Sequence, residues 1–302
     1  MRLRDLTYLV AVADHGSFRK AAAAMDVAQP TLSVQVRKLE EELGAELIDR
    51  SSTPLHLTPA GVVAVERARS ILKDVQSLDD AVRAAVAPTS GTLQLGVFPT
   101  LAPYLLSRVM PGVNERYPEL HLLITEEKTS KLLKRFDEGA LDAMLIAMPV
   151  DLPDANVLPL FREEFLFATA SAGQLANVPQ PIDPSNLEGQ ELLLLGEGHC
   201  LAAQIEDWLD TVGAHHTCPH RASSIESLRS MVSSGVGSTL LPALATQAPA
   251  ATDSVVTMRI ADPAPTRDIA LVWRPGNPRA ELLERLAPLL VPHGADLVTP
   301  LR

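Results

Sequence analysis

The chain has 302 residues, enough for about two domains of ordinary size and for a large buried core. Its hydrophobic share of 46% and charged share of 21% exclude long disorder and fibrous repeats, and no purely aliphatic stretch approaches the ~18 residues of a membrane span. The formal net charge of −11 argues against non-specific coating of nucleic acid, and two cysteines are too few for a disulfide framework.

Three helices are predicted in the first part of the chain. Apolar residues recur at helical spacing over 5–13, and Ser17 is a favourable N-cap for a second helix over 18–25. A third helix is predicted over 29–43, because proline is tolerated in its first turn and Gly44 ends it. The order of helix, helix, short turn and helix indicates a helix-turn-helix.

The third predicted helix has one apolar side and one small or polar side. The apolar stripe consists of Leu32, Val36, Leu39 and Leu43, and the other side carries Pro30, Ser33, Val34, Arg37 and Lys38. Small residues followed by two cations are typical of a recognition helix in the major groove, and an ordinary solvated face fits this helix equally well. Residues 1–39 carry six basic and three acidic side chains, a small positive surface on an acidic protein.

The residues after the third helix predict a wing and a long helix. Residues 48–50 and 55–57 are predicted as two strands around a polar turn, with Arg50 and Thr53 near a DNA phosphate. The next helix, over 59–85, repeats apolar residues at spacings near 3.5. At about 1.5 Å per residue it extends for about 40 Å, more than a small domain buries, so we expect it to pair with its copy in another subunit.

Strand and helix patterns alternate after a break at 88–91, which predicts an α/β fold. The predicted strands are 93–98, 121–125, 143–148, 165–168, 191–195, 255–260 and 269–273. The predicted helices are 104–116, 131–139, 201–212, 224–235 and 281–290. We therefore predict a winged helix-turn-helix domain over 1–58, a linker and dimerisation helix over 59–87, and a regulatory domain over 88–302.

Residues 1–86 resemble the DNA-binding region of the LysR-type transcriptional regulators. The segments that match are Gly16-Ser17-Phe18 with the alanine run after it, Ala28 to Val36, Leu39-Glu40, Leu43-Gly44, Leu47, Arg50 and Leu57 to Gly61. The likeness extends through the whole chain and favours DNA binding over a solvated helix face. It implies contacts to DNA from Gln29, Pro30, Thr31, Ser33, Arg37, Arg50 and Thr53.

The same resemblance implies the architecture of the regulatory domain. In this family that domain folds like a periplasmic binding protein, with two α/β lobes joined by two crossovers and an effector bound between them. For this chain the resemblance implies lobe I over about 91–163 and 268–302, and lobe II over about 164–267.

The regulatory region resembles, more specifically, the hydrogen-peroxide-sensing branch of the family. The matching segments are Gly96 to Thr100, Pro103 to Leu106, Gly139 to Asp142, Gly196 to Leu201, Ala222 to Arg229, Leu240 to Ala245 and Trp273 to Gly276. By this resemblance Cys200 is the cysteine that peroxide oxidises. Thr100, Thr129 and His199 match the groups that orient the peroxide.

The chemistry around Cys200 supports this assignment independently. Cys200 is predicted at the first turn of the helix over 201–212, where the helix macrodipole stabilises a thiolate, and His199 adds a donor or a positive charge. Hydroxyl donors such as Thr100 and Thr129 can stabilise the charge that develops on the departing peroxide oxygen. A buried, inert cysteine is the alternative interpretation.

One position departs from the pattern of the peroxide-sensing branch. The usual resolving cysteine lies nine residues after the peroxidatic one, and this chain has Leu209 there. Cys218 is the only other cysteine in the sequence and is a candidate resolving residue. Without it, Cys200 stops at sulfenic acid or is capped by a small thiol.

The segment from His215 to His220 leaves two interpretations open. If it is extended, His216, Cys218 and His220 lie on one face, and that ligand set suits zinc or copper. The spacing matches no established zinc finger, so a polar turn is the default, and no metal or other cofactor is expected.

The sequence therefore predicts an α/β transcriptional regulator, not an enzyme, that binds double-stranded operator DNA and senses hydrogen peroxide through Cys200. The resemblance implies a homodimer or homotetramer in the cytoplasm, with RNA polymerase as a partner and no membrane association. Two alternatives remain. One is a regulator of the same family whose inter-lobe cleft binds a small metabolite; the other is a thiol peroxidase, for which DNA binding serves no purpose.

Overall fold

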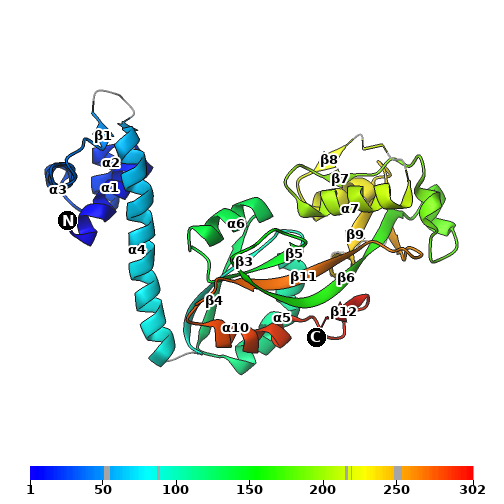
Figure 1. Cartoon of the computed structure of the whole chain (residues 1–302). Helices are drawn as coiled ribbons and strands as arrows, with labels where there is room; N and C mark the ends of the chain where they lie inside the picture. The colour runs from blue at the N-terminus through cyan, green and yellow to red at the C-terminus, as the bar shows by residue number, and fades with distance from the viewer. Residues whose placement is uncertain (51–54, 87–88, 215–216, 219, 248–253, 302) are drawn as a thin grey trace. The chain divides into compact units, whose positions relative to one another are not determined.

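The computed structural model of the chain describes residues 1–50, 55–86, 89–214, 217–218, 220–247 and 254–301 (Figure 1). The chain divides into two units, Met1–Val82 and Arg83–Arg302, each with its own hydrophobic core. No helix within the described ranges is long and apolar enough to cross a membrane.

The N-terminal unit is built on the three predicted helices; the first extends two residues further at each end, the second ends one residue earlier, and the third has the predicted bounds. They are α1 (Leu3–His15), α2 (Phe18–Ala24) and α3 (Gln29–Leu43). Gly16 and Gly44 adopt left-handed conformations, with φ of 57° and 67°, and so end α1 and α3. Ser17 caps α2 by accepting a hydrogen bond from the backbone N–H of Lys20 at 3.5 Å. The predicted helix-turn-helix is confirmed.

α3 packs its apolar stripe against α1 and α2, with one correction to the prediction. Leu32, Val36 and Leu39 are buried, whereas Leu43 is 47% exposed. Glu40 is buried instead, because its carboxylate accepts hydrogen bonds from the backbone N–H groups of Leu47 at 2.9 Å and Ile48 at 3.2 Å. The buried side of α3 therefore contains a carboxylate that ties the helix to the strand after it.

The predicted wing strands are present as β1 (Ile48–Asp49) and β2 (His56–Leu57), which pair antiparallel. The turn between them, including Thr53, lies outside the described residues. α4 (Pro59–Val86) follows directly, and its start packs against the wing. A side chain at Gly61 would collide with the backbone carbonyl of Leu47, so this close approach requires glycine.

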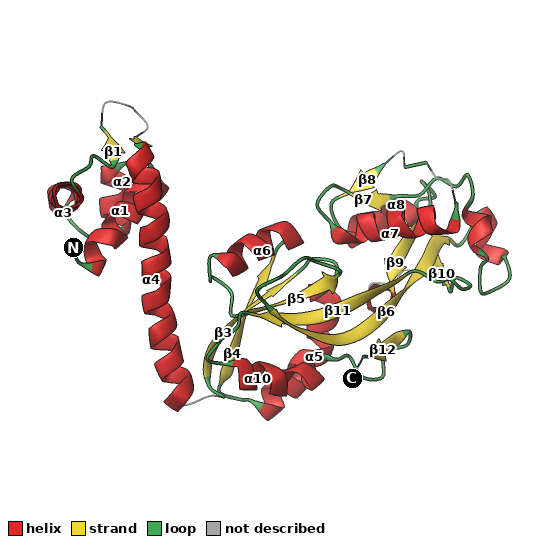
Figure 2. Ribbon diagram, in the orientation of Figure 1, coloured by secondary structure: helices red, strands yellow, loops and turns green. Residues whose placement is uncertain are grey.

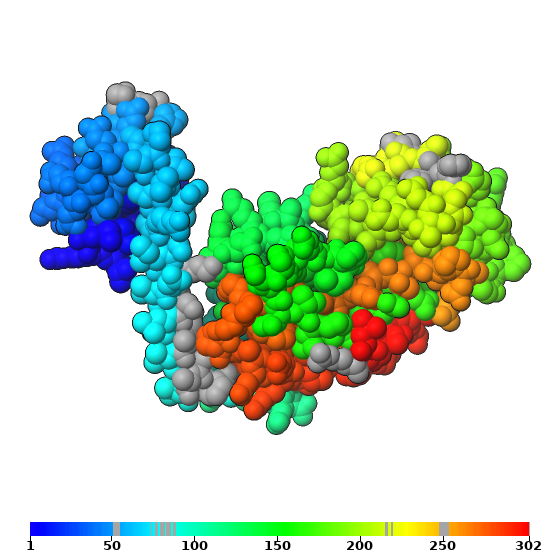
Figure 3. Space-filling model, viewed as in Figure 1, coloured from blue at the N-terminus to red at the C-terminus, as the bar shows by residue number. Residues whose placement is uncertain are grey.

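α4 presents apolar side chains to solvent beyond its contact with the N-terminal core. Val65 and Ala68 are buried, but the next stripe of the helix is exposed; it consists of Ile71, Val75, Leu78 and Val82. These residues follow one another at spacings of four, three and four residues. In Figure 3 the described part of α4 is the cyan segment. An exposed stripe with this period is typical of a helix that pairs with another helix.

We expect Leu78→Glu to weaken self-association through α4, because the new carboxylate would be buried among apolar side chains of the second copy. The dimer dissociation constant measured by analytical ultracentrifugation should rise by at least about tenfold. Ser70→Glu is the matched control, since Ser70 is exposed on another side of α4. Equal dissociation constants for the two variants would contradict pairing through this stripe.

Eight of the described strands of the second unit form one sheet, which confirms the predicted α/β class (Figure 2). Its order is β10-β6-β11-β5-β3-β4, with β9 and β12 also paired to β6. The strands are β3 (Gly91–Val97), β4 (Leu120–Glu126), β5 (Ala143–Met148), β6 (Asn156–Ala170), β9 (Thr239–Pro242), β10 (Val255–Met258), β11 (Thr266–Trp273) and β12 (Val298–Pro300). β3 runs parallel to β4 and β5, and β11 runs antiparallel to β5 and β6.

β6 runs through both lobes of the regulatory unit. Residues 156–164 pair with β11, and residues 165–170 pair with β9 and β10. The sequence predicts only 165–168 of this 15-residue strand, because Pro159 and three consecutive charged residues interrupt the apolar pattern before it. The two-lobed architecture is confirmed, and β6 belongs to both lobes.

Helices cover the sheet in both lobes. In lobe I, α5 (Ala102–Arg116) and α10 (Ala280–Leu286) lie on one face and α6 (Thr129–Asp137) on the other (Figure 2). A 3₁₀ turn, Ala287–Leu290, extends α10. The remaining elements are α7 (Cys200–Val212), α8 (Ile225–Ser233), α9 (Ala243–Thr246), the short strands β7 (Leu194–Leu195) and β8 (Arg221–Ala222), and the 3₁₀ turns Gln174–Asn177 and Pro184–Leu187.

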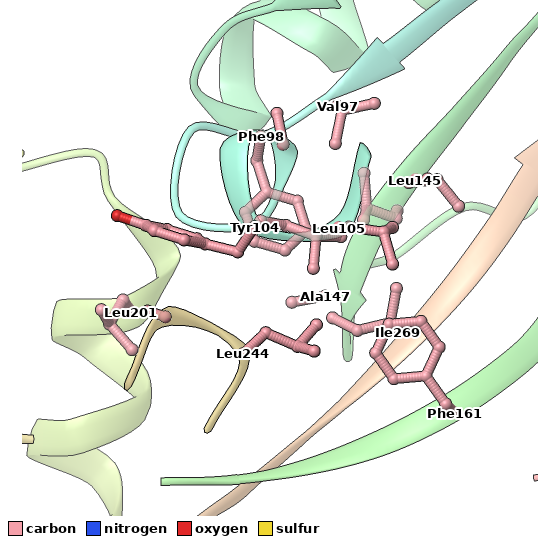
Figure 4. Close-up of a cluster of buried hydrophobic side chains, with 14 of the residues drawn as sticks. Val97, Phe98, Tyr104, Leu105, Leu145, Ala147, Phe161, Leu201, Leu244 and Ile269 are labelled. Carbon is pink, nitrogen blue, oxygen red and sulfur yellow. The ribbon is translucent and has the colours of Figure 1, made fainter. Parts of the chain in front are cut away.

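The lobes share a continuous apolar core. Leu201 from α7 and Leu244 from α9 belong to the same buried cluster as side chains of α5, β5, β6 and β11, part of which is drawn in Figure 4. The N-terminal turn of α7, with Cys200, is therefore packed between the lobes. This placement decides the environment of its thiol.

Candidate functional site

The start of α3 forms the exposed part of the predicted DNA-binding surface. Gln29, Pro30, Thr31 and Arg37 are exposed and Ser33 is half-buried. Arg50 lies at the end of β1, where its guanidinium pairs with the Glu40 carboxylate and stacks on the Phe18 ring, 5.7 Å from the ring centre. Arg50 thus has a structural role in joining α2, α3 and the wing, and its side chain keeps 36% exposure.

Cys200 is the first residue of α7, one position earlier than the predicted helix start. His199 occupies the N-cap position with extended backbone angles, φ −89° and ψ 121°. The turn before it depends on Gly198, which has a φ of +81° and lies against the Lys128 side chain. Lys128 Nζ donates a hydrogen bond to the Glu197 carbonyl at 2.6 Å, so α6 holds the turn that presents the thiol.

Two threonines from lobe I approach the same region. Thr129 is the first residue of α6, and its hydroxyl lies close enough to the Cys200 thiol to lower the thiol pKa. Its Oγ1 is buried without a hydrogen-bond partner of good geometry in the described part of the chain. Thr100 is buried in the turn between β3 and α5. Its Oγ1 accepts a hydrogen bond from Arg267 Nη1 at 3.0 Å, which leaves its own proton available for donation.

Burial dominates the titration of Cys200 and raises the pKa of its thiol above the ordinary value. The nearby Arg267 cation, the Thr129 hydroxyl and the backbone N–H groups at the start of α7 act in the opposite direction and do not outweigh burial. The sequence predicts a thiolate stabilised by the helix macrodipole. In the structure the resting form at neutral pH is the thiol, because the apolar packing of α7 costs the thiolate its hydration.

His199 is half-buried beside this thiol. Burial, and then the nearby Lys128 cation, lower the pKa of its imidazole. Of the two roles predicted for His199, a hydrogen-bonding group or a positive charge, the structure favours the neutral ring at physiological pH.

Arg267 is a buried side chain close to this site that the sequence does not single out. Both Arg267 and Glu163 have side chains with 0% exposure, and they form an ion pair at 2.7 Å in the core. The guanidinium donates from Nη2 to the Thr100 carbonyl at 3.0 Å and lies over the rings of Phe98 and Phe165. One sequence signal exists: alternation along β11 places Arg267 on the buried side that continues with Ile269 and Leu271.

Cys218 lies away from Cys200 in this structure. Thr217, just before it, pairs with Glu191 at the start of the segment that continues through β7 to Cys200. Cys218 therefore lies beside the start of this segment and Cys200 follows its end, and both cysteines are free thiols in the structure. The Cys218 thiol donates to the His220 carbonyl at 3.5 Å. Leu209, at the usual resolving position, is fully buried on α7.

The predicted ligand set of His216, Cys218 and His220 falls partly outside the described residues, since His216 is among those not described. Among the residues that are described, no group of three or more histidine, cysteine or acidic side chains is arranged to hold a metal ion.

Two family models match the chain and together cover most of it. The lysR family of bacterial regulatory helix-turn-helix proteins matches residues 3–62, and the LysR substrate binding domain matches residues 87–295.

Known relatives match almost the whole chain. The DNA-binding transcriptional dual regulator OxyR of Escherichia coli is 40% identical over 287 residues, which cover 95% of this chain and 94% of the relative. The hydrogen peroxide-inducible genes activator of Pectobacterium carotovorum is 40% identical over 293 residues, 97% of each protein.

The solved structures that resemble this chain are also of OxyR proteins. A cysteine-to-aspartate variant of full-length OxyR from Pseudomonas aeruginosa has a TM-score of 0.74 and 34% identity, covering 96% of this chain and 94% of that chain. A hydrogen-peroxide-bound cysteine-to-serine mutant of Corynebacterium glutamicum OxyR has a TM-score of 0.66 and 34% identity, covering 96% of this chain and 91% of that chain.

Proposed function

The chain belongs to the LysR family of bacterial transcriptional regulators, and we propose that it is a hydrogen peroxide sensor of the OxyR type in which Cys200 is the oxidised residue. The observation that carries the proposal is the convergence of two side chains, a hydroxyl and a cation, on one thiol. Cys200 lies at the start of α7, within reach of the unpartnered Thr129 hydroxyl and of the Arg267 cation. Hydroxyl donors and a cation around a packed thiol suit a small, neutral, hydrogen-bonding oxidant.

The proposed reaction is a two-electron oxidation of sulfur. The Cys200 thiol loses its proton, and the thiolate attacks one peroxide oxygen to form an S–O bond while the O–O bond breaks. The departing oxygen leaves as hydroxide, takes up a proton and becomes water. Thr129 and Thr100 donate hydrogen bonds to the peroxide oxygens, and Arg267 stabilises negative charge first on sulfur and then on the leaving oxygen. The product is a sulfenic acid on Cys200.

Intact-protein mass spectrometry after one equivalent of hydrogen peroxide tests this proposal. A gain of one oxygen indicates the sulfenic acid, and a loss of two hydrogens indicates a disulfide with Cys218. Consumption of one equivalent without turnover distinguishes a sensor from a peroxidase enzyme. An unchanged mass would contradict the proposal and favour the alternative in which the regulator binds a metabolite between its lobes.

The rate of oxidation is expected to depend steeply on pH. Because burial raises the Cys200 pKa, the thiol stays protonated at neutral pH, and the reactive thiolate fraction grows as pH rises toward that pKa. The second-order rate constant with hydrogen peroxide should therefore rise about tenfold per pH unit between about pH 6 and pH 8. Stopped-flow or competition kinetics measures it. A flat profile over this range would mean that the thiolate is already formed.

Cys218 enters this scheme as the candidate resolving residue. Its Sγ has to approach Cys200, so disulfide formation requires the start of α7 or the segment around Thr217 to move. If that movement does not occur, Cys200 remains a sulfenic acid or forms a mixed disulfide with a small thiol. The Cys218→Ser variant in the mass measurement decides between these products.

DNA binding is assigned to the start of α3. Arg37 is exposed beyond that start, and its charge suits a phosphate or a base edge in the major groove. Arg37→Ala should weaken operator binding by about 1–3 kcal/mol, measured by fluorescence anisotropy at fixed salt. Arg19→Ala, an exposed cation on α2, is the comparison. An affinity equal to that of the unchanged protein, with folding intact, would remove this part of α3 from the groove.

The remaining assignments follow from this function. We assign residues 1–58 to operator recognition, 59–87 to self-association as a dimer or tetramer, and 88–302 to peroxide sensing, with contacts to RNA polymerase in the cytoplasm. Gln29, Pro30, Thr31 and Ser33 complete the proposed operator surface.

A further inference from the structure

The carboxylate of Glu163 is a buried charged group near the sensing site that the proposed reaction does not use. Glu163 lies on β6, and its side chain has 0% exposure. Its Oε2 accepts a hydrogen bond from Arg267 Nε at 2.7 Å. Its Oε1 accepts one from the backbone N–H of Leu244, in the first turn of α9, also at 2.7 Å. The carboxylate therefore joins β6, β11 and α9 at one buried point.

Arg267 connects this point to the sensing site. Glu163 binds one edge of the guanidinium, and the other N–H groups point to the Thr100 hydroxyl and carbonyl, both at 3.0 Å. The rings of Phe98 and Phe165 lie 5.2 and 5.7 Å from the guanidinium carbon. Because a guanidinium is planar with its donors in a fixed fork, fixing one edge fixes the direction of the others.

We infer that Glu163 is a positioning residue for the reaction of Cys200 with peroxide and that it acts through Arg267. It aims the guanidinium at Thr100 and balances the positive charge that Arg267 presents to the thiol. This inference rests on the proposed function. It adds a residue whose contacts are to Arg267 and Leu244 rather than to the reacting atoms.

The charge balance has a measurable consequence at the thiol. A buried cation with its counter-ion attracts a nearby thiolate less strongly than an unbalanced cation does. Glu163 therefore favours the thiol form of Cys200 at rest, although Arg267 stays in place to stabilise charge during the reaction. A purely structural Glu163 would affect stability and leave the titration of Cys200 unchanged.

Glu163→Gln is the test, because glutamine keeps the shape of the side chain and removes its charge. The pKa of Cys200 is measured from the pH dependence of its alkylation by iodoacetamide, resolved by peptide mass spectrometry. We expect a decrease of about one unit. Glu164→Gln is the matched control, since Glu164 is the next residue on β6, is partly exposed, and pairs with the exposed Arg259 at 3.3 Å. It should leave the pKa unchanged.

Equal Cys200 pKa values in Glu163→Gln and Glu164→Gln would overturn the inference. If Glu163→Gln fails to fold, the double variant Glu163→Gln with Arg267→Gln decides, because it leaves no unpaired buried charge. Its Cys200 pKa should lie above that of the unchanged protein, and an equal value would overturn the inference. The titration needs no peroxide, so a wild-type thiol that does not react with peroxide would contradict the proposed function separately.

Discussion

Cys200→Ser is expected to abolish the response to hydrogen peroxide. A serine hydroxyl in the same position at the start of α7 keeps the packing and the nearby donors but cannot be oxidised by peroxide. The variant should bind operator DNA as the reduced protein does, and its mass and its footprint on DNA should stay unchanged after peroxide treatment. The expected loss is complete rather than partial, because the reaction has no other thiol in the same environment.

Cys218→Ser is the matched control for this experiment. If Cys200 acts as a sulfenic acid or a mixed disulfide, this variant responds to peroxide as the unchanged protein does. A response lost equally in both variants would identify Cys218 as the resolving residue and would replace the one-cysteine interpretation. A response kept in both variants would leave the regulator without a thiol switch.

Arg267→Met is expected to destabilise the regulatory unit by about 3–5 kcal/mol, because it leaves the fully buried Glu163 carboxylate without its counter-ion. The substitution also removes the hydrogen bonds from Arg267 that hold the turn at Thr100. Urea unfolding followed by circular dichroism measures the change. The double variant Arg267→Met with Glu163→Leu should recover most of the loss, since it leaves no buried charge unpaired.

Arg162→Met provides the control on the same strand. Arg162 neighbours Glu163 and forms two hydrogen bonds with Asp268, at 2.6 and 2.7 Å, but its side chain is 51% exposed. Loss of this solvent-screened pair should cost less than about 1 kcal/mol. Similar losses for Arg162→Met and Arg267→Met would contradict the special role of burial at Arg267.

Local signals determine which elements were predictable. α3 has its predicted ends because Gly44 must adopt a left-handed conformation and proline fits the first turn. The sequence also indicated Cys200 at the start of α7, since the glycine-containing turn and the apolar helix lie next to each other. β5 has the predicted bounds, 143–148, because its apolar run is continuous.

Long-range pairing was not predictable from such signals. Glu163 lies in a charged stretch that resembles a loop, and it is buried only because Arg267, 104 positions later, lies on the neighbouring strand. The upward shift of the Cys200 pKa also results from contacts between residues that are far apart in the sequence. The position of Cys200 at a helix start follows from the local sequence and favours the thiolate. Burial between the lobes depends on tertiary packing, and its effect on the pKa is larger.

The continuity of β6 through both lobes restricts which parts of the regulatory unit can rearrange after oxidation. Bending one lobe against the other would break ladder hydrogen bonds in the buried sheet, whereas α7 packs on β7, a strand of two residues outside that sheet. Backbone amides of β6 and β11 should therefore exchange with deuterium most slowly, and those of 196–202 much faster. We therefore expect oxidation of the thiol to refold only α7 and the turn before it, at a free-energy cost of a few turns of backbone rather than of a domain.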